Sequence, residues 1–457
     1  MRAILEGRER RPTGSSRLFG KDPDDMKRQQ PGVKSHTDSS TFIRYVMAFT
    51  AFLCLFVPGL LLAQTTSPPT RTDLEDTIQK LKDQLQQIEE QHRKEIADMK
   101  DRLGVIEQRQ SSFSDELAQN IRVGAYGAVL FESFKDRRTT HDGNFEVLIS
   151  GNFHDRIRVY TEIDLGLPHG TAEAEQAYVD LLLAQAFNLR AGVLLIPFGK
   201  FNLDHFDPRR DLIRPPSVAR LVTPTTWSDL GFSAFGLIPI SENVKATYEV
   251  QVVNGLTDRF LASPGSIPEP GLQSGKTGLR TDNNGDKAVV GRGTLKFFDQ
   301  YEIGFSGYRG AYKPSSSDLI TGVGFDAEFK PRNVRFWENF QLRSEFARFD
   351  IQGSTTPSSL WGYYIQLTYR FWPSVLNSTI LGRHFNNPTF ALVGLYGRTK
   401  MNTAASPTGS LTGEQIIVGF NYRPVEDYVF KMEYQFNNGQ FNQFPSDGFL
   451  TSIAWIF

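Results

Sequence analysis

From residue 120 to the C-terminus, apolar and polar side chains alternate along a series of long segments. In one of them, Ile157, Val159, Ile163 and Leu165 share one face, while arginine, tyrosine and acidic side chains occupy the other. The same alternation recurs at 244–252, 361–371 and 428–436. A period of two residues is the spacing of β-strands whose two faces meet different surroundings. The pattern therefore predicts an all-β region over 120–457.

Three properties of these segments favour a membrane-spanning barrel over a soluble β-sandwich, which also shows alternation. The segments span about ten residues or more, whereas soluble strands average about five or six. Their apolar faces begin and end with aromatic residues, as in the girdles of outer-membrane barrels. Their polar faces carry several charges, which are costly in a packed core and natural in a wet lumen.

The last strand ends on the last residue of the chain. Phe449, Ile453, Trp455 and Phe457 share one face at two-residue spacing. This arrangement resembles the C-terminal recognition strand of bacterial outer-membrane barrels. We therefore expect these four residues to act as the assembly signal for the barrel-assembly machinery, with outer-membrane lipid around the barrel.

The alternating pattern yields seventeen candidate strands, and bacterial barrels have even strand numbers. The segment 376–385 alternates poorly, so we expect an antiparallel barrel of sixteen or eighteen strands with an aqueous channel. Short turns such as 239–242 and 423–427 should face the periplasm. The longest connectors, 198–228 and 255–285, should face outward.

The N-terminal region has a different organisation. Residues 1–63 are interpreted as a signal peptide with an over-long n-region, because an apolar run follows Arg44 and breaks at Pro58-Gly59 before Ala63. An uncleaved inner-membrane anchor is the alternative, since the run approaches the roughly 20 residues that span a bilayer. Residues 64–70 form a linker.

Residues 71–110 carry a heptad-like pattern that predicts an α-helical coiled coil. Its first apolar positions, spaced four and three residues apart, are Leu74, Ile78, Leu81, Leu85 and Ile88. Mixed Ile and Leu at both core positions favour a trimer. A single amphipathic helix on a domain surface is the alternative.

Composition excludes several classes of protein. Fifty basic and 51 acidic residues leave a net charge of −1, so a chain built to coat nucleic acid is excluded. A mean hydropathy of −0.34 excludes a polytopic helical membrane protein, and a single cysteine excludes a disulfide framework. The seven histidines show no metal-binding spacing, and no nucleophile-elbow, P-loop or dinucleotide motif occurs. We therefore expect no enzymatic activity, no cofactor and no metal.

Several sequence blocks resemble the phosphate-selective porin O and P family. These blocks are EQAYVDLLL, NLRAGVLLIPFGK, YEVQVVNG, DNNGDKAVVGR and FNYRPVEDYVFKMEYQF, and the resemblance covers roughly 71–457. It implies a trimeric, sixteen-stranded channel with an N-terminal coiled coil and an inward-folded third loop. The arginine run through which some members bind anions has no clear counterpart here.

Candidate functional residues fall into two groups. The polar faces of the strands predict a lumen wall with nearly balanced charges, which we interpret as ion-pair ladders; its candidates are Arg156, Arg158, Glu162, Asp164, Arg190, Arg343 and Glu345. The connector after the fifth strand has an excess of cations and corresponds to the inward loop of the family. Its candidate constriction residues are Lys200, Arg209, Arg210, Arg214 and Arg220.

Unpaired guanidiniums of Arg209, Arg210 and Arg214 would favour anions in a narrow pore. Charges on an exposed outer loop are the alternative explanation. The sequence thus predicts an exported, homotrimeric outer-membrane porin of a Gram-negative bacterium, for small ions or hydrophilic solutes, which an inward connector of this charge would bias toward anions. A structural or adhesive barrel tethered through its coiled coil and a barrel enzyme are the alternatives.

The coiled-coil assignment generates a testable prediction. A 70–112 peptide should sediment as a trimer, and the double substitution Leu81→Asp with Leu85→Asp should make it monomeric. Carboxylates buried at the seam cost several kcal/mol unless the helices separate. A wild-type peptide that stays monomeric at high micromolar concentration in analytical ultracentrifugation would contradict the prediction.

Overall fold

The computed structural model describes residues 120–166, 171–261, 271–276, 282–332, 334, 337–441 and 444–457, with scattered positions between 79 and 100. The chain forms two compact units, Met1–Lys100 and Asp101–Phe457. The expected signal peptide (1–63) and linker (64–70) lie outside the described residues. Within 71–110, the described positions are helical and exposed, and self-association remains a prediction. The described residues contain no helix that combines the length and the apolarity needed to span a membrane.

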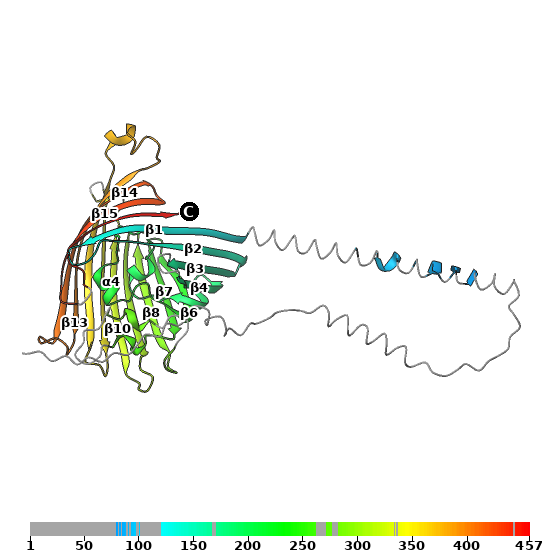
Figure 1. The fold of residues 1–457 in the computed structure, drawn as a ribbon, viewed down its shortest axis with the longest axis horizontal. Coiled ribbons are helices and arrows are strands. Elements are labelled where there is room, and N and C mark those ends of the chain that lie inside the picture. The colour runs from blue at the N-terminus through cyan, green and yellow to red at the C-terminus, as the bar shows by residue number, and fades with distance from the viewer. Residues whose placement is uncertain are drawn as a thin grey trace, which may run out of the picture. The chain divides into compact units, whose positions relative to one another are not determined.

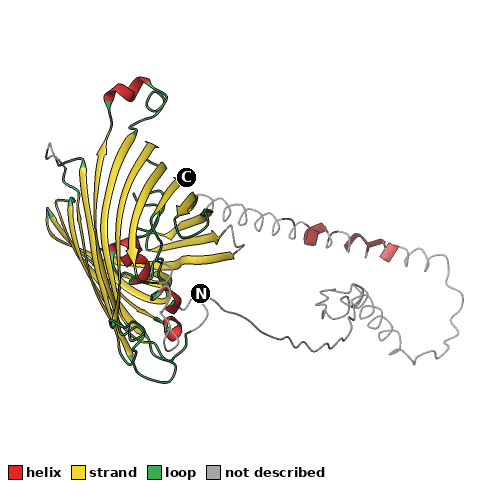
Figure 2. Cartoon of the chain, turned by 60° about the vertical axis from the view of Figure 1, so that its left-hand side comes forward, coloured by secondary structure: helices red, strands yellow, loops and turns green. Residues whose placement is uncertain are grey.

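The second unit is a closed antiparallel barrel of sixteen strands (Figures 1 and 2). The strands are β1 (Ile121–Phe134), β2 (Thr140–His154), β3 (Ile157–Gly166), β4 (Thr171–Ala184), β5 (Phe187–Leu195), β6 (Ser228–Ser241), β7 (Val244–Val253), β8 (Ala288–Phe297), β9 (Tyr301–Ala311), β10 (Leu319–Phe329), β11 (Phe340–Ile351), β12 (Ser359–Phe371), β13 (Thr389–Asn402), β14 (Ser410–Val425), β15 (Tyr428–Gly439) and β16 (Gly448–Ile456). Each strand pairs with its neighbours in sequence, and β16 pairs with β1. The predicted barrel is confirmed, at the lower of the two expected strand numbers.

The two-residue period separates an outer and an inner face of the wall. In β7, Val250 and Val252 are exposed on the outside, whereas Gln251 between them is fully buried on the inside. Exposed apolar side chains at every second position suit a surface covered by acyl chains. The alternation therefore arises because lipid surrounds the wall and polar groups line its interior.

Strand direction places the connectors at two ends of the barrel. Because neighbouring strands are antiparallel, every connector after an even-numbered strand lies at the end where β1 begins. Most of these are tight turns, such as 155–156, 185–186, 242–243 and 426–427. The connector 372–388 after β12 is an exception, so the expected rule of short turns at this end holds only in part.

The strand expected at 376–385 is wrong. This segment belongs to the connector 372–388, which contains the 3₁₀ helix η5 (Ser374–Ser378) and projects beyond the strands in the orange part of Figure 1. Its apolar residues do not alternate, and Ile380 is 85% exposed. The backbone N–H of Thr379 donates to the carbonyl oxygen of Leu376 instead of to a neighbouring strand. Without a period of two, the segment cannot present one face to lipid and one to the lumen.

The seam between β1 and β16 closes the barrel. The backbone N–H of Phe457 donates to the carbonyl oxygen of Ala125 at 2.9 Å, and the N–H of Ala125 donates to the carbonyl oxygen of Phe457 at 2.9 Å. Phe449, Ile453 and Phe457 are exposed on the outer face. The last residue therefore contributes both a reciprocal backbone pair and an apolar side chain to the seam.

The seam generates a prediction about assembly. Deletion of Phe457 should reduce the amount of heat-modifiable barrel in the outer membrane more strongly than Phe457→Ala. The alanine variant keeps the two backbone hydrogen bonds, each with a net contribution of about 1 kcal/mol. Semi-native electrophoresis of membrane fractions measures the folded form. Equal, wild-type amounts of folded barrel for both variants would contradict this role.

Candidate functional site

The connector between β5 and β6 crosses the interior of the barrel. This inward connector (196–227) includes two short helices, α3 (Lys200–Leu203) and α4 (Ser217–Leu221). Figure 1 labels α4 among the strands of the barrel. Helix α4 contacts β12 and β13, on the opposite side of the ring from β5 and β6. The connector that the family resemblance placed inward therefore does span the lumen.

The first anchor of the inward connector is the buried carboxylate of Glu345 on β11. It accepts the backbone N–H groups of Lys200 at 3.0 Å and Phe201 at 2.9 Å. Gly199 precedes them with a φ of 72°, and a Cβ at this position would lie 2.3 Å from Oε1 of Glu345. Only glycine allows both this backbone conformation and this close approach. The anchor thus depends on one glycine and one carboxylate, 146 positions apart.

The second anchor is Asp211, which is buried against β12 and β14. Its carboxylate accepts hydrogen bonds from Nη2 of Arg370 at 3.0 Å and from Oγ1 of Thr368 at 3.1 Å. Its backbone carbonyl accepts from Nδ2 of Asn421 at 2.9 Å. A buried carboxylate is stable only when it is paired and hydrogen-bonded, as it is here.

Side chains of the wall also satisfy the backbone of the inward connector. Nζ of Lys431 donates to the carbonyl oxygens of Asp207 at 2.6 Å and Leu212 at 3.1 Å. A carboxylate oxygen of Glu433 accepts the N–H of Ile213 at 3.0 Å. The connector has little regular structure, so its buried backbone groups need such partners. Charged residues of β15 therefore bind the backbone of the connector and do not line a water-filled channel.

An apolar core fills part of the interior. Phe198 and Trp227, at the two ends of the inward connector, pack with Phe349 and Tyr308 of the wall; the ring centroids of Phe198 and Phe349 are 4.7 Å apart, and those of Trp227 and Tyr308 are 5.2 Å apart. The sequence predicted a charged, wet inner face, whereas in this part of the barrel apolar side chains fill the interior. Sequence analysis did not predict this core, because its residues come from many strands and from irregular connectors.

A second connector, 254–287, also packs inside. It contains η2 (Asp258–Phe260) and η3 (Gln273–Gly275) in its described part, and the N–H of Leu272 donates to the carbonyl oxygen of Leu221 in α4 at 3.2 Å. Phe260 and Leu272 belong to the same buried cluster as α4. This connector was expected to face outward, but these large apolar side chains require cover.

The wall charges form ion pairs, as the balanced composition indicated. Asp180 accepts from Arg158 at 2.6 Å and from Arg190 at 2.6 Å. On β8 and β10, Arg292 pairs with Asp326 at 2.6 Å. Paired charges cancel much of each other's field beyond a Debye length of about 8 Å.

The other wall candidates have different positions. Arg343 pairs with Glu328 at 2.9 Å and with Asp204 of the inward connector at 2.6 Å. Arg156 is not a wall residue, because it lies exposed in the turn between β2 and β3. Asp164 is half-buried on β3, and Glu162 is fully buried beside the inward connector.

The structure corrects the expected electrostatics of the constriction candidates. Arg210 pairs with Asp207 and donates to the backbone carbonyls of His205, Leu212 and Ile213. These contacts make it a structural brace, so the expectation of an unpaired guanidinium fails here. The sequence cannot reveal this, because the partners are created by the fold of the connector itself.

Lys200 and Arg214 are paired as well. Nζ of Lys200 lies 3.0 Å from Oε1 of Glu302 and 2.5 Å from Oε2 of Glu328. Arg214 donates to Glu132 at 2.6 Å and to Asp142 at 3.0 Å, so its expected lack of a partner is also wrong.

Arg209 and Arg220 have no carboxylate within 4.0 Å among the described residues. Arg209 is exposed, and its guanidinium lies over the ring of Phe206 with a centroid distance of 5.7 Å. Arg220 lies in α4, where burial, and then the charges of Arg214 and Arg137, lower the pKa of its guanidinium to about 10. It therefore remains charged at neutral pH.

Arg214 and Arg220 line one cavity together with Arg137, and we call this cavity the arginine pocket. Its volume is about 220 Å³, and its charged and amide lining consists of Glu132, Arg137, Arg214, Arg220, Gln415 and Gln435. Sequence analysis found Arg214 and Arg220 but missed Arg137, which lies in the connector between β1 and β2. No periodic pattern in the sequence predicts that Arg137 lies beside the inward connector.

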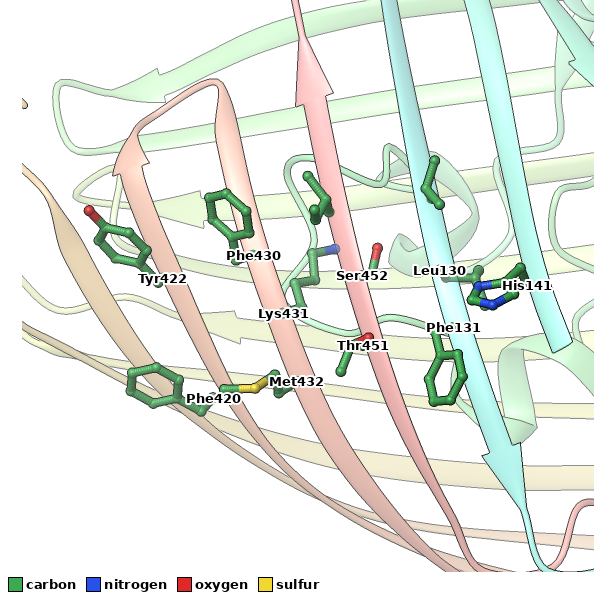
Figure 3. A pocket seen from close by; sticks show the side chains of 12 residues that line it. Leu130, Phe131, His141, Phe420, Tyr422, Phe430, Lys431, Met432, Thr451 and Ser452 are labelled. Atoms are coloured by element: carbon green, nitrogen blue, oxygen red, sulfur yellow. The ribbon is translucent and has the colours of Figure 1, made fainter. Parts of the chain in front are cut away.

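A different hollow lies on the outside of the barrel. Figure 3 shows this depression of about 370 Å³ over β1 and β14–β16, with Phe420, Phe430 and Met432 among its lining. Most of these side chains belong to the exposed outer face, while Lys431 and Ser452 are buried and belong to the inner face. Its apolar lining suits acyl chains, so it is not part of a route through the barrel.

Comparisons with known sequences give one distant relative. No protein-family model matches the chain. The chain is 21% identical over 373 residues to an uncharacterized protein of Aquifex aeolicus (strain VF5), with 75% of this chain and 81% of the relative covered.

Among solved structures, the chain is similar to Salmonella typhi OmpF in complex with daunomycin, with a TM-score of 0.50 at 10% identity over 74% of this chain and 98% of that one. An anion-selective porin from Comamonas acidovorans has a TM-score of 0.46 at 9% identity, over 74% of this chain and 99% of that one. The sixteen-stranded barrel thus has the fold of outer-membrane porins.

Proposed function

We propose that this protein is an outer-membrane porin through which small hydrophilic solutes diffuse passively, with a preference for anions. The observation that carries the proposal is the arginine pocket, where Arg137, Arg214 and Arg220 surround a cavity beside an inward connector that crosses the lumen. The porin fold supports the channel, and the unpaired charge of Arg220 supports the anion preference. Membership of the phosphate-selective porin O and P family, implied by the sequence blocks, remains a prediction.

The distribution of charge favours anions for a physical reason. Most wall charges are paired, so their fields largely cancel across water at physiological ionic strength. Arg220 is held in a confined, partly buried position, where one unpaired charge has a larger effect than in bulk water. A guanidinium also offers several N–H donors in a fixed fork that suits carboxylate and phosphate oxygens. The selectivity should therefore depend on Arg220 more than on the numerous wall charges.

Reversal potentials test the role of Arg220. Arg220→Gln should shift the reversal potential of the purified protein in a planar bilayer under a salt gradient toward cation preference. Arg156→Gln is the matched control, because it removes the same charge from an exposed turn. A shift in the control as large as that of Arg220→Gln would show that net charge, and not the pocket, sets the selectivity.

Single-channel conductance tests whether the inward connector limits flow. Asp211→Asn should increase the mean conductance and the current noise, since breaking a buried ion pair costs about 3 kcal/mol of the docking free energy. Asp350→Asn, at an exposed pair with Arg348, is the control. Semi-native electrophoresis should show that both barrels fold.

Wild-type conductance and noise in Asp211→Asn would show that the connector does not constrict the pore. An absence of any channel activity in the wild-type protein would instead favour a structural or adhesive barrel.

A further inference from the structure

Four potential metal ligands converge where the inward connector meets the first strands of the wall. Glu146 on β2, Glu162 on β3, Glu175 on β4 and His205 of the connector each place one ligand atom within 4.8 Å of the others. Nε2 of His205 lies 3.1 Å from Oε2 of Glu175 and 3.5 Å from Oε1 of Glu162. We call these four residues the His205 cluster.

The imidazole of His205 is oriented as in a metal ligand. The residue is 5% exposed, and its Nδ1 lies 3.2 Å from the backbone carbonyl oxygen of Asn202, which can accept the ring N–H. Nε2 therefore points into the cluster, and it has no hydrogen bond of proper geometry among the described residues. Oε2 of Glu175 is likewise buried without a hydrogen bond among them. A metal-bound histidine characteristically donates its other ring N–H to a carbonyl or carboxylate.

A surrounding layer of donors holds two of the carboxylates. Nε2 of Gln176 donates to Glu162 at 2.5 Å, and Nδ2 of Asn144 donates to Glu146 at 2.9 Å. The hydroxyl of Tyr126 contacts both carboxylates, at 2.9 Å from Oε1 of Glu162. Both oxygens of each carboxylate thus accept a hydrogen bond, which fixes the carboxylate in place, and each oxygen keeps a second lone pair that could bind a cation. In metal sites, outer partners of this kind orient the ligands.

The cluster contains more acidic than basic side chains. Three carboxylates face one imidazole, and within the described residues no lysine or arginine lies within 4.0 Å of them. A bound cation would supply the compensation that buried carboxylates need.

We propose that the His205 cluster binds one divalent transition-metal cation, of which Zn²⁺ is the representative. Three carboxylate oxygens and one imidazole nitrogen supply four ligands, the number typical of Zn²⁺ sites. Ligand atoms around tetrahedral Zn²⁺ lie about 2.0–2.2 Å from the metal and hence about 3.4 Å from one another, so metal binding has to draw together those atoms of the cluster that now lie up to 4.8 Å apart. Imidazole favours such a cation over Ca²⁺, which takes oxygen ligands.

The ion would have a mechanical role. Glu146, Glu162 and Glu175 come from three adjacent strands, whereas His205 belongs to the connector that crosses the lumen. Coordination would fasten the connector to this side of the wall, opposite the anchor at Asp211. The spacing of these residues along the sequence carries no metal motif, because the barrel wall and the connector assemble the cluster.

Metal analysis of the intact protein tests the proposal. Tag-free full-length protein is purified from the outer membrane, treated with EDTA, equilibrated with Zn²⁺ and desalted, and its metal is measured by inductively coupled plasma mass spectrometry. The wild-type protein should retain one Zn²⁺ per chain, and His205→Ala and Glu162→Gln should each lower retention at least tenfold. His141→Ala and Glu414→Gln are the controls, because His141 is exposed, Glu414 is half-buried and neither belongs to the cluster; they should retain the wild-type amount.

Two results would overturn the proposal. One is wild-type protein that retains no Zn²⁺; the other is full retention in folded His205→Ala. If the ligand variants do not give heat-modifiable barrel, zinc-edge X-ray absorption of the wild-type protein decides. Scattering from one imidazole with oxygen ligands supports the site, and a shell without imidazole refutes it.

Discussion

Every backbone N–H and C=O group within a bilayer must find a partner inside the protein, and this requirement determines the architecture of the chain. A closed ring of sixteen antiparallel strands meets it, with β16 completing the ladder of β1 through the reciprocal hydrogen bonds of Ala125 and Phe457. Closure then separates an outer face in lipid from an inner face that must be filled, paired or wetted. The same requirement applies to the inward connector, whose irregular backbone is satisfied by side chains of the wall.

The interior uses charge mainly for attachment. Glu345, Asp211, Lys431 and Glu433 are buried ions that hold the inward connector through its backbone or its side chains. Buried ions contribute little net stability when compared with apolar residues, but the loss of one partner is costly. Such contacts therefore specify where the connector lies. The apolar cluster around Phe198 and Trp227 stabilises the connector by burying apolar surface, and the buried charged side chains fix its path across the lumen.

The proposed roles of Arg220 and His205 depend on whether the charged side chains around them are paired. Where acids and bases pair, the charge is structural, as at Arg210 and Arg214. Where pairing is incomplete, charge remains for a solute or an ion. The arginine pocket has an excess cation and the His205 cluster has excess carboxylates, and both lie where the inward connector meets the wall. One connector would thus carry a site for anions and a site for a metal cation.

The sequence by itself determined sixteen of the seventeen expected strands, their outer and inner faces, the outward side chains of the last strand and the excess of cations in the connector after β5. These features follow from a local period of two residues and from local composition, which need no knowledge of distant contacts. Only the tertiary structure decided that Arg210 and Arg214 are paired, that the second connector packs inside and that residues 376–385 form no strand. It alone also brought Glu146, Glu162, Glu175 and His205 together. The reason is that ring closure and the path of a connector across the lumen set which side chains meet, and neither leaves a periodic trace in the chain.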